Sequence, residues 1–88
     1  MRTVLDNPRV LVTWHRLPPW RSQREPRHFH PREVVLVYLA GGEIRGSTGR
    51  LGIRRVRRGD FDVLPANVLH TFHNAGNDPI EFLMITPK

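Results

Sequence analysis

The chain contains no cysteine, so no disulfide can cross-link its 88 residues. That absence is typical of proteins from a reducing compartment. The first ten residues lack the apolar stretch of a secretory signal peptide, and the longest apolar run, residues 34–40, is too short to cross a bilayer. We therefore expect a soluble, cytoplasmic protein with no membrane partner.

The short length of the chain predicts one domain, which spans residues 1–88. A domain this small buries a limited share of its surface, so without disulfides it needs support from a metal or from oligomerisation. We expect a homodimer. The apolar segment VLVTW, residues 10–14, would be shared or paired across a twofold axis, which would bury its side chains and satisfy a strand edge.

Positive charge dominates, because thirteen arginines and one lysine give a net charge of +6. The one dense cluster is RRVRR, residues 54–58. The sequence shows neither a helix-turn-helix pattern nor zinc-finger spacing, and few aromatic residues lie among the arginines to stack on bases. We interpret the cluster as a solvated or dimer-rim strand and expect no nucleic-acid partner. The alternative is that some of these arginines reach a cavity and bind a carboxylate or phosphate.

Helix signals are weak, since eight prolines and seven glycines interrupt the chain every few residues. Between them lie short runs rich in valine, isoleucine, leucine and aromatic residues, a spacing that predicts an all-β sandwich or barrel. The consecutive glycines at 41 and 42 indicate a hairpin, and Gly59 with Asp60 indicates a turn. We predict strands at residues 9–15, 33–40, 43–45, 51–56, 61–64, 69–73 and 80–86.

Two histidines one residue apart, His28 and His30, are followed closely by Glu33 and then by an apolar run. In an extended strand, residues i and i+2 face the same way, so both imidazoles would point toward one place. His70 lies on a later strand, after a strand-turn-strand unit. These three histidines can converge on one metal ion if the sheet curls into a barrel.

The surroundings of His70 resemble the second motif of the cupin family. That motif runs glycine, five residues, proline, one residue, glycine, two residues, histidine, three residues, asparagine. Gly59, Pro65, His70 and Asn74 all fall in place. Asn67 stands where the family has its second glycine, and asparagine also tolerates the left-handed conformation.

The first cupin motif is matched less completely. His28 and His30 supply its histidine pair, and Gly41 or Gly42 can serve as its closing glycine. Ser22 occupies the position of the family's opening glycine. The two motifs cover about residues 22–42 and 59–74, and the resemblance extends from residue 22 to the C-terminus.

This resemblance implies a small double-stranded β-helix (cupin or jelly-roll) barrel that often forms homodimers. It also implies a divalent metal ion (Mn, Fe, Ni, Zn or Cu) held by histidines and usually one glutamate. We predict a metal-binding cupin. As an enzyme it would be of the dioxygenase or isomerase type and would act on a small anionic or carbonyl substrate. The alternative is a non-catalytic ligand-binding or sensory cupin. Because one fold hosts many activities, the sequence leaves the catalytic residues and the choice between enzyme and binding protein open.

The fourth ligand is less certain from spacing, because Val34 and Val35 occupy the usual glutamate positions. Glu33 is the nearest carboxylate, but on a regular strand from His30 it points away from the ion. A bulge at residues 31–32 would reset the parity and let Glu33 bind the metal. We favour a three-histidine site in which Glu33 orients a histidine N–H or a bound water.

Three further residues have expected orientations. His73 has the opposite parity to His70, so it should face away from the ion. Asn74 should tie a turn by hydrogen bonds instead of binding metal. Tyr38 either presents its hydroxyl to the cavity or packs in the core with the hydroxyl at the rim.

Overall fold

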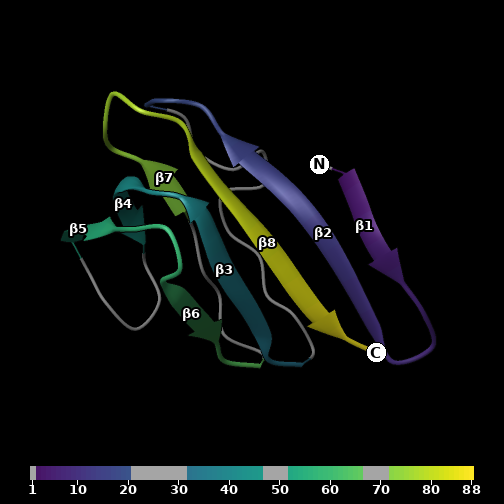
Figure 1. The fold of residues 1–88 in the computed structure, drawn as a ribbon. Helices are drawn as coiled ribbons and strands as arrows, with labels where there is room; N and C mark the ends of the chain where they lie inside the picture. Colours follow the sequence, from purple (N-terminus) through teal and green to yellow (C-terminus); the bar gives the residue numbers. More distant parts are fainter. Residues whose placement is uncertain (1, 21–31, 47–51, 67–71) are drawn as a thin grey trace.

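The structure is a computed structural model that describes residues 2–20, 32–46, 52–66 and 72–88 (Figure 1). Over the described residues it contains eight strands and no helix. The strands predicted from residue 9 onward are confirmed to within two residues where the structure describes them, but residues 69–71 of the predicted strand 69–73 lie outside the described residues. The sequence pattern did not predict β1. The strands are β1 (Arg2–Asp6), β2 (Val10–Leu17), β3 (Val34–Ala40), β4 (Gly42–Gly46), β5 (Gly52–Val56), β6 (Phe61–Leu64), β7 (Phe72–Asn74) and β8 (Ile80–Pro87).

The strands form two antiparallel sheets. The larger sheet has the order β1-β2-β8-β3-β6 and the smaller has the order β5-β4-β7. The C-terminal strand β8 therefore lies at the centre of the larger sheet, between β2 and β3 (Figure 1). Most neighbouring strands are distant in sequence, so the fold depends on contacts that no local propensity specifies.

The chain passes from the larger to the smaller sheet at Gly41, between β3 and β4. A Cβ atom at this position would come within 2.1 Å of the Val56 carbonyl oxygen. Only glycine allows the backbones to approach so closely, so Gly41 is required for packing. The hairpin expected at Gly41 and Gly42 is wrong, because β3 and β4 belong to different sheets and do not pair with each other.

One core fills the space between the two sheets, because alternate residues of each strand point inward. The larger sheet contributes most of it, and the smaller sheet contributes from β4 and β5. The buried cluster consists of Leu17, Val34, Leu36, Tyr38, Ile44, Val56, Leu64, Ile80, Phe82 and Met84.

The turn between β5 and β6 is fixed by hydrogen bonds at both ends. The Arg57 N–H donates to the Asp60 side chain at 2.8 Å, and Gly59 has a φ of +90°. The Gly59 N–H also donates to the Tyr38 carbonyl at 2.9 Å, which ties the turn to β3. The predicted turn at Gly59 and Asp60 is therefore confirmed.

Strand β2 has no free edge, contrary to the reasoning that led us to expect dimerisation through it. It pairs with β8 along its whole length and with β1 over residues 11–14. The outermost strand on that side is β1, and all five of its residues are exposed. The homodimer itself stays a prediction, but pairing through β2 is wrong because β1 already occupies that edge.

Candidate functional site

Three of the four predicted metal ligands, His28, His30 and His70, lie outside the described residues. Within the described part of the chain, no group of three or more histidine, aspartate or glutamate side chains is placed to bind a metal ion. Glu33 is described, and it lies just before β3 with its side chain exposed. The next residue, Val34, is fully buried and begins the inward-facing series of β3.

Asn74 is a structural residue of the second motif, as expected. Its side chain is completely buried and makes three hydrogen bonds. The amide nitrogen donates to the carbonyls of Leu17 at 3.0 Å and Asp78 at 2.7 Å, and the amide oxygen accepts from the Gly76 N–H at 3.0 Å. These bonds join the loop after β7 to the end of β2, so every polar group of the asparagine is used in holding the fold.

His73 points away from the core, which confirms its expected orientation. It pairs with Arg45 on β4, whose side chain is exposed, whereas the next residue, Asn74, pairs with buried Ile44. Because successive residues of a strand alternate between faces, His73 lies on the outer side of the smaller sheet.

A row of rings crosses the inner face of the larger sheet. His15 on β2 lies opposite Phe82 on β8, and their rings stack with centroids 5.0 Å apart. Tyr38 on β3 lies on the other side of Phe82, with an edge-to-face contact at 6.2 Å. The His15 Nε2 and the Thr13 hydroxyl are 2.8 Å apart. Burial lowers the pKa of His15 below its usual 6.5, so the imidazole is neutral at pH 7.

Tyr38 and Asp62 continue this polar set toward β6. The buried Tyr38 hydroxyl donates to Asp62 Oδ2 at 2.6 Å. Asp62 pairs with Leu36, which is also buried, so the carboxylate lies on the inner face. Tyr38 thus has its hydroxyl inside the protein, and its nearest carboxylate is a residue that sequence reasoning did not single out.

Sequence reasoning also missed His15, because the residue pattern of its strand is ambiguous. Thr13, His15 and Leu17 alternate with Val12 and Trp14, and either set fits the inner face of a strand. Buried Thr13 and Leu17 show that the set containing the histidine faces inward.

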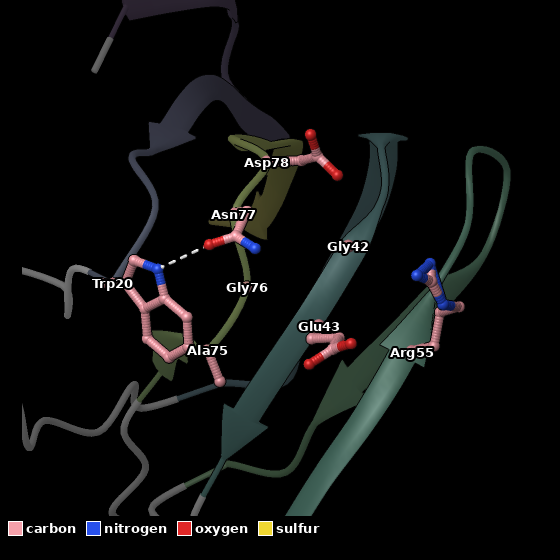
Figure 2. Close-up of a pocket in the computed structure, with 8 residues that line it drawn as sticks. All are labelled: Trp20, Gly42, Glu43, Arg55, Ala75, Gly76, Asn77 and Asp78. Atoms are coloured by element: carbon pink, nitrogen blue, oxygen red, sulfur yellow. Dashed lines mark hydrogen bonds between the residues drawn. The ribbon is translucent and has the colours of Figure 1, made fainter.

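A pocket lies on the outer side of the smaller sheet and is shown in Figure 2. The indole N–H of Trp20 donates to the Asn77 side chain at 3.1 Å, and this contact fixes one wall. Glu43 and Arg55, which are opposite each other on β4 and β5, contribute charges of both signs. The pocket has a volume of about 250 Å³ and is lined by Trp20, Gly42, Glu43, Arg55, Ala75, Gly76, Asn77 and Asp78.

The arginine cluster fits the solvated strand that we expected. Arg55, Arg57 and Arg58 are exposed, while Val56 between them is buried in the core. Of these arginines, Arg55 lines the outer pocket.

Comparison with known families identifies the fold. The sequence model of the cupin domain matches residues 13–86. The chain belongs to the cupin family. The fold is accordingly the double-stranded β-helix that the two motifs led us to expect.

Solved cupin structures share this architecture over nearly the whole chain. A cupin domain protein from Bordetella pertussis is 28% identical, with a TM-score of 0.81 over 98% of this chain and 88% of its own. An RmlC-like cupin from Methanocaldococcus jannaschii, described as a double-stranded β-helix, is 20% identical, with a TM-score of 0.80 over 98% of this chain and 76% of its own. No curated protein sequence matches this chain.

No helix in the described ranges is long and apolar enough to cross a membrane.

Proposed function

We propose that this cupin binds one divalent metal ion through His28, His30 and His70, beside a small-molecule site inside the barrel. The observation that carries the proposal is the pair of histidine motifs in a chain whose cupin match spans residues 13–86. Three neutral imidazoles suit Mn, Fe, Ni, Zn or Cu. A bound ion would supply Lewis-acid or redox chemistry to a small anionic or carbonyl ligand.

The positions of Glu33 and Val34 bear on whether the metal has a fourth protein ligand. Val34, the first inward residue of β3, is apolar and fully buried, while Glu33 before it is exposed. This arrangement supports a three-histidine site, in which Glu33 orients a histidine or a bound water without binding the metal.

The inner wall supplies the chain's own polar groups. The neutral His15 imidazole, the Tyr38 phenol and the Asp62 carboxylate lie on one face of the larger sheet. A ligand in the barrel would meet this polar row among apolar side chains, which is the usual composition of a small-molecule site.

One feature of this wall favours the alternative, a non-catalytic ligand-binding cupin. Tyr38 donates to Asp62, and His15 is hydrogen-bonded to Thr13. Groups that are hydrogen-bonded to one another rigidify a wall, which suits a site that only binds its ligand. We also propose a cytoplasmic location, on the basis of the cysteine-free composition.

Metal analysis of the purified protein tests the proposal. We expect about one divalent ion per chain, bound more weakly below about pH 6 because the imidazoles must be neutral. His70→Ala should abolish binding, whereas His73→Ala, on the outer side of β7, should retain it. Glu33→Gln should weaken binding by no more than the roughly 10–100-fold typical of residues that orient a ligand.

Two outcomes would contradict these expectations. If folded His70→Ala, checked by circular dichroism, binds metal as tightly as the wild type, the three-histidine site is wrong. If Glu33→Gln loses the metal as completely as His70→Ala, the glutamate is itself a ligand.

A further inference from the structure

The pocket on the outer side of the smaller sheet contains none of the proposed metal ligands. Strands β4 and β5, the loop between β7 and β8, and the turn at Trp20 contribute to it (Figure 2). Its volume of about 250 Å³ lies below the roughly 300–1,000 Å³ of pockets for drug-sized ligands. The small residues Gly42, Ala75 and Gly76 leave the space between the larger side chains open. The pocket therefore suits a molecule of about the size of an amino acid.

Trp20 forms one wall of the pocket in a backbone conformation that tryptophan rarely adopts. Its φ is +59°, in the left-handed region that normally selects glycine or asparagine. The residue is 59% exposed, so burial in the core does not offset this strain. Instead, the indole N–H donates to the Asn77 side chain at 3.1 Å, which fixes the ring at the pocket. Strain of this kind concentrates at ligand-binding sites, where it holds a side chain in the orientation that binding requires.

Three charged side chains line the pocket without a protein partner in the described part of the chain. Glu43 and Arg55 are opposite each other on β4 and β5, and Asp78 lies in the loop before β8. None of these side chains forms an ion pair or a hydrogen bond with another described residue. Two carboxylates and one guanidinium give the pocket a net charge of −1, in a chain whose net charge is +6. A complementary ligand carries two positive groups and one negative group.

The order of these groups across the pocket indicates how the charges of the ligand are arranged. In Figure 2, Trp20 and Arg55 lie on opposite sides and Glu43 lies between them. A planar guanidinium can stack on an indole and donate two parallel hydrogen bonds to a carboxylate, whereas an ammonium group cannot do both. A carboxylate at the other end of the ligand would accept hydrogen bonds from Arg55 in the same bidentate way.

We propose that this pocket binds a small ligand with a guanidinium at one end and an amino acid group at the other, the chemistry of free arginine. The ligand guanidinium stacks on the Trp20 indole and donates to Glu43. The ligand carboxylate accepts from Arg55, and its ammonium donates to Asp78. Binding here is independent of the proposed metal site, because the two share no residue.

Tryptophan fluorescence tests the proposal, with free L-arginine as the probe and a chelator present so that metal in the barrel plays no part. The chain has two tryptophans, so Trp14→Phe leaves Trp20 as the only one. Its emission should change saturably, with a dissociation constant of about 1 mM or below. Citrulline replaces the guanidinium by a neutral urea of the same shape, and agmatine lacks the carboxylate. Each should bind at least about tenfold more weakly than arginine, because charged hydrogen bonds are lost.

Variants of the charged residues locate the binding. Glu43→Gln should raise the dissociation constant for arginine about tenfold or more. Arg55→Gln should do the same for arginine but should not weaken the binding of agmatine, which has no carboxylate for Arg55 to hold. Arg58→Gln is the matched control, because Arg58 is exposed but does not line the pocket, and it should leave the dissociation constant unchanged. Circular dichroism checks that each variant is folded.

Three results would overturn the proposal. The first is that Trp20 emission shows no saturable change with L-arginine up to about 10 mM. The second is equal affinity for arginine and citrulline, which would show that the pocket does not recognise the guanidinium. The third is an effect of Arg58→Gln as large as that of Arg55→Gln, which would show that arginine responds to the charge of the whole surface and not to this pocket.

Discussion

Replacing Asn74 by alanine should be among the most destabilising single changes outside the apolar core. The side chain is fully buried, and its three hydrogen bonds reach Leu17, Gly76 and Asp78. Alanine removes all three partners and leaves two carbonyls and one N–H to find others. The Leu17 carbonyl is bonded in a buried setting, so stranding it costs about 1–3 kcal/mol.

The other two groups are only partly buried, so water can largely replace the amide, at a cost of about 0.5 kcal/mol each. The total loss should therefore be about 2–4 kcal/mol. A chain of this length is expected to have a free energy of unfolding of about 4–13 kcal/mol, so the loss is a large fraction of it. For small domains each kcal/mol lowers Tm by about 4–8 °C, which predicts a drop of roughly 10–30 °C.

Urea and thermal unfolding, followed by circular dichroism, measure this effect. The matched control is Asn77→Ala, three residues along the same loop. Asn77 is exposed and accepts one hydrogen bond, from the Trp20 indole, so its loss should cost about 0.5 kcal/mol or less. If Asn74→Ala lowers the free energy of unfolding by less than about 1 kcal/mol, the buried amide does not hold the loop as argued.

Two further predictions concern stability. Because burial lowers the pKa of His15 in the folded protein below the unfolded value of 6.5, the stabilisation that depends on its neutral form is complete above pH 6.5. It is lost as the pH falls below 6.5 toward the folded pKa, so the free energies of unfolding of wild type and His15→Gln should change differently between pH 7 and 5. Gly41→Ala should lower Tm more than Gly59→Ala. A Cβ atom at position 41 would come within 2.1 Å of a backbone oxygen. A Cβ atom at position 59 would meet nothing within 4 Å, so that substitution costs only the strain of a positive φ, about 1–2 kcal/mol. Equal shifts in Tm would show that the backbone near Gly41 yields easily.

The strands were predictable where apolar runs alternate between turn residues, as in β3 and β8. Strand β1 was not, and its structure explains why. All five residues of β1 are exposed, and its sequence RTVLD does not alternate between apolar and polar residues. It is ordered by backbone pairing with β2, which includes a register shift between Thr3 and Leu5. Pairing partners and bulges depend on distant parts of the chain, which local sequence does not specify.

The candidate site was predictable only in part. The motifs named the histidines and gave Asn74 its structural role, and the role is confirmed by its hydrogen bonds. Sequence reasoning did not identify His15 and Asp62 as site residues, because the spacing of residues along one strand does not show which face of the strand packs against the core. That choice is made by the register against β8 and β3, which appears only once the sheet has formed.

Strand β6, FDVL, shows the consequence most clearly. Binary patterning would place Phe61 and Val63 in the core and Asp62 in water. The structure does the reverse, because Leu64 pairs with Val34 and Asp62 pairs with Leu36, both on the inner face. A slip of one residue would exchange the two faces.

The observed register makes physical sense if both faces of β6 are used. Inside, the Asp62 carboxylate accepts the Tyr38 hydroxyl at 2.6 Å, so the buried phenol is satisfied. Outside, Phe61 and Val63 lie opposite Val37 and Val35 of β3 and are 66% and 48% exposed. Departures from local patterning concentrate at functional sites, where the gain lies in contacts beyond the strand itself. The reversed pattern of β6 therefore serves the polar wall of the proposed ligand site, because this register brings the Asp62 carboxylate to the Tyr38 hydroxyl.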